Sequence, residues 1–337
     1  MPSPYEKIDC HSHYLPAGYG EALANNGHKY PDGMPGIPTW SEEAHLDMMS
    51  TCNITKCILS ITSPGVHLVA NDDELAGKVA RLCNDAGAEL KRRRPDQFGF
   101  FASLPVPNIE EAIVELNRAY DELDCDGITL ETNKHGVYLG DSRLDPLMAE
   151  LNNRHGTLFI HPTTPCMPDG QTAAVPLTLF PRSTYEFFFD TCRTVINLFA
   201  TGTVRCNPNI TFIIPHMGGA FPPLIQRFSR VAPILGLPGI DPELSPDFVL
   251  DRLNNQFYFD TAGWPFGGQA QGLLQYVSPK RILFGTDFPF TPLPAVISAV
   301  AGHDQHMVTT FGSDEAVERV CRGNARRLLQ EKARTGR

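Results

Sequence analysis

The stretch "KIDCHSHYLP", residues 7–16, starts as a short apolar run and contains two histidines, His11 and His13, one residue apart. Alternate side chains of a β-strand share a face, so a strand here places both imidazoles on one side and Ser12 on the other. Two half-exposed histidines at a polar strand end are one interpretation. A metal chelate is the other, and it requires further ligands elsewhere in the chain.

Seven more short apolar runs follow this stretch, with amphipathic helical patterns between most of them. Two of these patterns, 72–93 and 108–123, begin with helix-capping residues. Apolar strands that alternate with helices predict an α/β fold, a parallel (β/α)8 TIM-type barrel. The expected strands cover residues 7–10, 56–61, 98–104, 127–131, 157–161, 211–216, 256–261 and 281–287.

Three connections, 14–40, 163–183 and about 231–247, are long and rich in proline and glycine. The first two directly follow strands, so we expect them at the C-terminal face of the barrel, where such barrels place their active sites. No repeat and no shift in composition divides the chain. We therefore expect residues 1–337 to form a single domain.

The composition is that of a globular enzyme, with 42% hydrophobic and 20% charged residues. No apolar run approaches the roughly 18 residues that a membrane span needs. The net charge is −10 and the one basic run lies at 91–94, which argues against a nucleic-acid partner. Nine cysteines without a C-x-x-C pair indicate reduced thiols, no sulfur-ligated metal and a cytoplasmic location.

Polar side chains stand at the ends of several expected strands: His11 and His13 after the first, His161 after the fifth, His216 after the sixth and Asp287 after the eighth. A closed barrel brings its strand ends into one mouth. Taken singly, each is explained as a strand-end residue bonded to backbone. Together, imidazole and carboxylate groups at one cavity fit zinc or a similar divalent ion. The sequence therefore predicts a metalloenzyme.

The segments around these residues resemble the amidohydrolase superfamily and, within it, the amino-carboxymuconate-semialdehyde decarboxylase family, over essentially the whole chain. The resemblance is carried by "IDCHSHYLP" (8–16), "FIHPTTP" (159–165), "PHMGGAFPPLIQRF" (215–228) and "ILFGTDFPF" (282–290). It implies that one metal ion per subunit is bound and that His216 stands beside it without being a permanent ligand. The implied ligands are His11, His13, His161 and Asp287.

The first motif keeps both histidines, which favours zinc, with manganese as the alternative. A binuclear site would need a bridging group at the end of the fourth strand, where Glu131 and Lys134 are the only candidates. We interpret these two as loop-end residues, because four ligands and a water already complete a mononuclear site.

Residues 136–162 look most like 6-methylsalicylate decarboxylases, which implies a non-oxidative decarboxylation of 6-methylsalicylate to 3-methylphenol and CO2. Asp287 would carry a proton to the ring carbon, and His216 would tune that proton or orient water. A metal-dependent hydrolase such as a lactonase, with His216 as its base, is the alternative. A catalytically silent binding protein is a third reading, and the complete ligand set argues against it.

Residues 14–80 contain no arginine. Relatives whose substrates carry an additional anionic group resemble one another in using an arginine from this region, and lysine does not easily replace it. We therefore expect a small aromatic substrate with one carboxylate on an otherwise apolar ring. The 20 phenylalanines suit such a pocket, and Phe290 in "FPF" (288–290) is the candidate substrate contact.

Arg227 lies eleven residues beyond His216. In the family that the chain resembles, an arginine at this spacing reaches the neighbouring subunit's site and meets the substrate carboxylate. The resemblance therefore implies a homodimer in which Arg227 acts across the interface. Among the other histidines, His67 follows the second strand and is a minor candidate for the pocket wall, whereas we expect His303 to lie on the surface.

Overall fold

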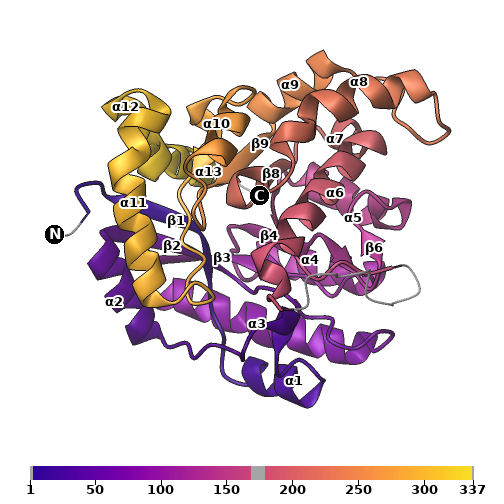
Figure 1. Ribbon diagram of the computed structural model, residues 1–337. Helices are drawn as coiled ribbons and strands as arrows, with labels where there is room; N and C mark the ends of the chain where they lie inside the picture. The colour runs from indigo at the N-terminus through magenta and orange to yellow at the C-terminus, as the bar shows by residue number, and fades with distance from the viewer. Residues whose placement is uncertain (1–2, 168–178, 336–337) are drawn as a thin grey trace.

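The computed structural model describes residues 3–167 and 179–335, and its centre is an eight-stranded parallel sheet (Figure 1). The strand order is β1-β2-β3-β4-β7-β8-β9-β10, so each strand lies beside the next strand of the sheet along the chain. All eight expected strands are present, which confirms the barrel fold. Their bounds are β1 Lys7–His13, β2 Ile54–Ser60, β3 Phe98–Ser103, β4 Gly127–Glu131, β7 Thr157–His161, β8 Thr211–Ile214, β9 Phe257–Asp260 and β10 Ile282–Leu283.

The barrel closes where the segment after β10 meets β1. Asp9 and Phe284 form a parallel bridge, and the Cys10 N–H donates to the Phe284 carbonyl at 2.9 Å. The Asp287 N–H donates to the His11 carbonyl at 2.8 Å, so the chain continues along β1 after regular pairing has ended. The eighth strand is thus shorter than the expected 281–287, because residues 284–287 bond to β1 without forming a regular ladder.

Helices surround the strands (Figure 1). The side chains of Asp72 and Asn108 accept hydrogen bonds from the first turns of α3 and α4, as the sequence predicts. The α-helices are α1 Tyr19–Asn25, α2 Glu42–Cys52, α3 Asp73–Arg93, α4 Ile109–Asp121, α5 Asp145–Asn153, α6 Glu186–Ala200, α7 Thr203–Cys206, α8 Ile225–Leu235, α9 Pro246–Asn255, α10 Gly268–Leu274, α11 Leu293–Phe311, α12 Asp314–Glu318 and α13 Asn324–Thr335.

Two apolar clusters form the core. The larger lies between the sheet and the surrounding helices. The smaller fills the barrel with one or two side chains from every strand of the sheet except β4 and is joined by Ala325 and Leu328 of α13. Since α13 packs on this inner cluster, the barrel is a filled core, and polar chemistry is left to the strand ends.

Two of the three long connections predicted from the sequence contain helices. The connection 14–40 contains α1 and the short helix η1 (Pro31–Gly33), and α8 extends into the expected loop 231–247. Part of the connection 163–183 lies outside the described residues. An unexpected hairpin of β5 (Asn133–Lys134) and β6 (Val137–Tyr138) follows β4. Among the helices described, none combines the length and the apolar character that crossing a membrane would need.

Candidate metal centre and active site

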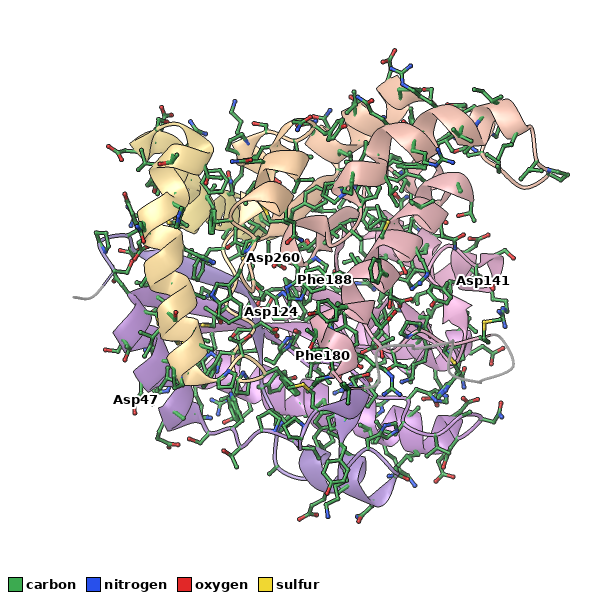
Figure 2. The ribbon with its side chains drawn as sticks, in the orientation of Figure 1. Asp47, Asp124, Asp141, Phe180, Phe188 and Asp260 are labelled. Atoms are coloured by element: carbon green, nitrogen blue, oxygen red, sulfur yellow. The ribbon has the colours of Figure 1, made fainter. Side chains whose placement is uncertain are left out.

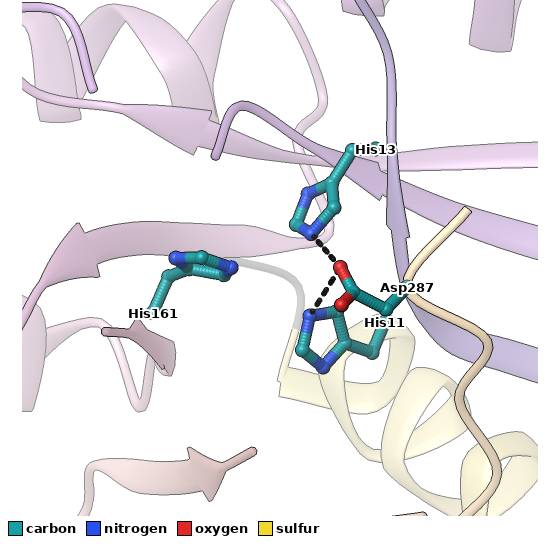
Figure 3. A group of neighbouring side chains, drawn as sticks. All are labelled: His11, His13, His161 and Asp287. Carbon is teal, nitrogen blue, oxygen red and sulfur yellow. Dashed lines mark ion pairs between the residues drawn. The ribbon is translucent and has the colours of Figure 1, made fainter. Parts of the chain in front are cut away.

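Four side chains from three places in the chain meet at the mouth of the barrel. His11 and His13 lie on β1, His161 ends β7, and Asp287 follows β10. One ligand atom from each lies within 4.8 Å of the ligand atoms of the other three. Figure 3 shows His11 and His13 facing Asp287, with His161 on the opposite side of the same space.

The geometry of these groups fits a metal ion. Nε2 of His13 lies 3.1 Å and Nε2 of His11 lies 3.6 Å from Asp287 Oδ1. Both nitrogens are buried, and neither has a hydrogen-bond partner among the described residues. Buried polar atoms without partners are rare and costly, so the convergence of these two nitrogens on one point fits a site for a cation. Three imidazoles and one carboxylate make up a ligand set that suits zinc and similar divalent ions.

The second ring nitrogens are held by the protein. His13 Nδ1 lies 3.2 Å from the Ser60 carbonyl and 3.1 Å from Ser60 Oγ. His11 Nδ1 lies 2.9 Å from Asp260 Oδ2. Such contacts orient metal-binding histidines. Asp260 is not among the residues predicted from the sequence, although it is the last residue of β9 and lies at a strand end like the predicted groups.

His161 has a different environment. Its Nδ1 lies 2.7 Å from the Pro162 carbonyl, and its Nε2 lies 3.2 Å from Thr62 Oγ1. Burial and the neighbouring His13 and His11 lower the pKa of His161 well below its ordinary value, so its ring is neutral. A neutral imidazole is the form that binds a metal.

The charges within the site favour the metal-binding protonation state of Asp287 but not that of His11. Burial alone would raise the pKa of Asp287, but the hydrogen bond to His13 and the charges of His11 and His13 have the larger effect and lower it. The carboxyl is therefore ionised. Burial lowers the pKa of His11, but Asp260 and then Asp287 and Asp9 outweigh it and raise the value to about 9. Because a ligand imidazole must be neutral, binding of a metal at His11 would release its proton.

His216 stands beside these four groups, in a second group with His11 and Asp260. Its ring lies 5.0 Å from that of His11 and stacks on Phe188 at 5.3 Å between centroids. Its backbone N–H donates to Asp260 Oδ1 at 3.0 Å. Burial and His11 lower the pKa of His216, which keeps its ring neutral. His216 thus lies next to the four-residue group, and its role beside a metal ion stays a prediction.

A cavity of about 390 Å³ opens above the metal centre. Aromatic side chains form much of its wall, including Phe188 of α6, which is labelled in Figure 2, and the predicted substrate contact Phe290. None of the described residues that line it is a lysine or arginine. The lining residues are Asp32, Met34, Thr62, Ser63, His161, Ser183, Thr184, Phe187, Phe188, His216, Gly263, Trp264, Asp287, Phe290 and Thr291.

Other residues singled out in the sequence lie elsewhere. Arg227 is exposed on α8 and does not line the cavity of its own chain. His67 is also absent from the cavity wall, because it bonds to Asp73 and His135. The prediction that His303 lies on the surface is wrong: its side chain is buried on α11, with Nε2 3.3 Å from the Gly263 carbonyl.

Glu131 ends β4, Lys134 ends β5, and both are buried. Neither belongs to a metal-binding group among the described residues. Lys134 donates a hydrogen bond to the Pro64 carbonyl. They are therefore strand-end residues rather than the loop-end residues that the sequence suggested.

The sequence matches the family model described as amidohydrolase over residues 8–330. The chain belongs to the amidohydrolase family. Among curated relatives of this amidohydrolase, the 6-methylsalicylic acid decarboxylase acuB of Aspergillus aculeatus is 36% identical over 294 residues, which cover 86% of each chain.

Solved structures agree with the fold. A protein described as amidohydrolase II is 32% identical, with a TM-score of 0.85, and the match covers 96% of this chain and 100% of that one. The 5-carboxyvanillate decarboxylase of Novosphingobium aromaticivorans, solved with manganese and a nitrobenzoic acid, is 20% identical with a TM-score of 0.80. That match covers 97% of this chain and 96% of the other.

Proposed function

We propose that this amidohydrolase is a metal-dependent, non-oxidative decarboxylase that converts 6-methylsalicylate to 3-methylphenol and CO2. The observation that carries the proposal is a His3Asp group at the bottom of a cavity whose wall includes Phe187, Phe188, Trp264 and Phe290. A cavity of about 390 Å³ suits a single-ring acid. The curated relative at 36% identity is named for the same substrate, whereas nothing in the comparisons favours the lactonase alternative.

His11, His13, His161 and Asp287 would hold the metal, which we propose to be zinc, one ion per subunit. Manganese is the alternative, and the manganese-containing 5-carboxyvanillate decarboxylase supports it. When bound, a divalent ion supplies positive charge that the carboxylate and ortho-hydroxyl oxygens of the substrate can share. The aromatic wall, including Phe290, would orient the ring and exclude water from it.

Asp287 is the proposed proton carrier, because it belongs to the metal-binding group and also lines the cavity. In the reaction, the ionised Asp287 would first take up a proton from water and then deliver it to the ring carbon that bears the carboxylate. The bond between that carbon and the carboxylate then breaks, its electron pair returns to the ring, and CO2 leaves. His216 lines the same cavity with a neutral ring and would orient the substrate or a water that exchanges this proton.

The cavity wall leaves the substrate carboxylate without a cationic side chain from its own chain, among the residues described. We propose that Arg227 of a second subunit supplies it in a homodimer. An open apolar hollow of about 620 Å³ lies next to the cavity, shares Phe188 and Thr184 with it, and offers a surface that a second copy could cover. Exposed apolar side chains at the end of α8, Ile234 and Leu235, support the same arrangement.

Mixing two variants under conditions that exchange subunits tests this arrangement. Arg227→Ala and Asp287→Ala should each be inactive alone. A mixed dimer contains one site with intact Asp287 from its own chain and intact Arg227 from the partner, so activity should reappear. If Arg227 serves its own chain or has no role, mixing restores nothing.

Two further proposals concern the number of domains and the cellular location. We propose that residues 1–337 form one domain, which the family match over 8–330 supports. We also propose a cytoplasmic location, since no disulfide joins any of the nine cysteines, all of which lie in the described part of the chain, and reduced thiols persist in that compartment.

The experiment that tests the activity combines metal analysis of the purified protein with two substrate panels. Salicylates with different ring substituents should release CO2, and 6-methylsalicylate should have the highest kcat/KM. Lactones should remain unhydrolysed. Lactone turnover without release of CO2 from any salicylate would refute the proposal.

A further inference from the structure

Asp260, the last residue of β9, is completely buried and uses its two carboxylate oxygens for different partners. Oδ2 lies 2.9 Å from His11 Nδ1. Oδ1 accepts hydrogen bonds from the backbone N–H groups of His216 and Ala262, both at 3.0 Å. One carboxylate therefore joins a candidate metal ligand to the histidine that stands beside the metal centre.

The contact with His11 decides which ring nitrogen is free. An ionised carboxylate can only accept hydrogen bonds, so His11 Nδ1 must carry the proton. In the neutral ring, Nε2 then bears the lone pair. This nitrogen is the one that faces Asp287 and has no hydrogen-bond partner within the described part of the chain. Asp260 thus selects the tautomer of His11 that can bind a metal at the mouth of the barrel.

The contact with His216 acts on the backbone. His216 and Met217 have φ values of 52° and 50°, in the left-handed region that side chains other than glycine rarely adopt. The bond from the His216 N–H to Asp260 holds this conformation. His216 Nδ1 also lies 3.2 Å from the carbonyl of Ala262, whose own N–H is bound to the same carboxylate oxygen. Asp260 therefore fixes the backbone of His216 and the group that its ring contacts.

We propose that Asp260 is a positioning residue, which presents His11 Nε2 to the metal and holds His216 beside it. The inference rests on the metal centre of the proposed function and adds a residue to it. A carboxylate with a purely structural role would stabilise the barrel without changing the affinity for metal. The test must therefore measure metal binding separately from folding and from activity.

Asp260→Asn changes the tautomer with little change in shape. The amide oxygen can still accept from both backbone N–H groups, while the amide NH2 then faces His11 Nδ1 and can only donate. Nδ1 must accept, the proton moves to Nε2, and the ligand is lost. We expect zinc affinity, measured by competition with a chromophoric chelator, to fall by about 10- to 100-fold. Circular dichroism should show the wild-type fold.

Asp190→Asn is the matched control. Asp190 is equally buried, but it accepts hydrogen bonds from Thr132, Asn133 and Tyr138 rather than from a histidine ring. This variant should bind zinc with wild-type affinity even if its melting temperature falls. A folded Asp260→Asn protein that binds zinc as tightly as the wild type would overturn the inference.

NMR of the zinc-loaded wild-type protein with 15N-labelled histidine keeps the inference testable if Asp260→Asn does not fold. The expected spectrum has a proton on His11 Nδ1 and zinc on Nε2, and zinc on Nδ1 would overturn the inference. A wild-type protein that binds neither zinc nor manganese would overturn the metal centre as well. The two failures are therefore distinguishable.

Discussion

Histidines form two clusters in the structure: the metal centre, and a second cluster of His67, His135 and Asp73. The two clusters differ in the partners of their ring nitrogens. At the metal centre, Nε2 of His11 and Nε2 of His13 are buried, lack hydrogen-bond partners among the described residues, and face Asp287. In the second cluster, His67 has no free nitrogen. Its Nδ1 lies 3.0 Å from His135 Nε2, and its Nε2 lies 2.9 Å from Asp73 Oδ1.

The difference shows why residue type alone does not identify a metal site. Both clusters combine imidazole and carboxylate groups, although His11, His13 and His161 lie on strands and His67 lies on a connection. Only the first directs unpaired nitrogens toward a common point, which leaves a binding role for a cation. In the second cluster the ring nitrogens of His67 already have hydrogen-bond partners within the protein, so a structural role explains it. These contacts connect the segment after β2 to the start of α3 and to the β5–β6 hairpin.

The strongest contrast between the clusters should come from two alanine variants. His13→Ala removes a proposed ligand, so we expect loss of stoichiometric metal and of detectable turnover. His67→Ala removes paired hydrogen bonds, so metal content should stay at the wild-type level while the free energy of unfolding falls by about 1–3 kcal/mol. Metal analysis and thermal unfolding measure both effects. Loss of metal from His67→Ala and not from His13→Ala would reverse the assignment of the two clusters.

Asp287→Asn should reduce turnover by at least about 100-fold, because it removes the proposed proton carrier as well as a charged ligand. CO2 release from 6-methylsalicylate measures the rate, and metal analysis shows whether the ion is still bound. Activity above a few per cent of wild type with metal present would mean that another group protonates the ring.

His216→Ala should retain metal, because His216 is outside the four-residue group. The rate should fall, by about 100-fold if His216 takes part in proton transfer. A variant that keeps its metal and loses its rate separates this histidine from the ligands. Loss of stoichiometric metal would instead make His216 a ligand.

The smallest expected effect concerns acid stability in the second cluster. Burial, with Lys134 and His67, lowers the pKa of His135 from 6.5 to about 4. Because the unfolded chain binds this proton more readily, His135 should destabilise the fold as the pH falls from 6.5 toward 4 and have no such effect above 6.5. His135→Gln should therefore flatten part of the decline in melting temperature over this range. An unchanged pH profile would contradict the prediction.

Much of the fold could be predicted because each strand is a short apolar run and each strand end is marked by polar residues. The eighth strand was the exception, since residues 284–287 bond to β1 without regular pairing. The β5–β6 hairpin was not foreseen, because it consists of two-residue strands that carry no periodic pattern.

The candidate ligands could also be predicted, since the barrel topology alone brings His11, His161 and Asp287 together. The sequence did not reveal which partners individual side chains contact or how deeply they are buried. Asp260 was overlooked within an apolar run, and His303 was placed on the surface although its ring is buried against Phe266 and Phe284. Tertiary contacts decide such details, and no local pattern encodes them.

A metal titration tests the central claim most directly. The wild-type protein is stripped with a chelator, and zinc or manganese is added back while CO2 and 3-methylphenol formed from 6-methylsalicylate are measured. The account predicts no turnover without metal and a linear rise in activity that stops at one ion per subunit. Full turnover by the metal-free protein, or metal-loaded protein that forms no 3-methylphenol, would contradict it.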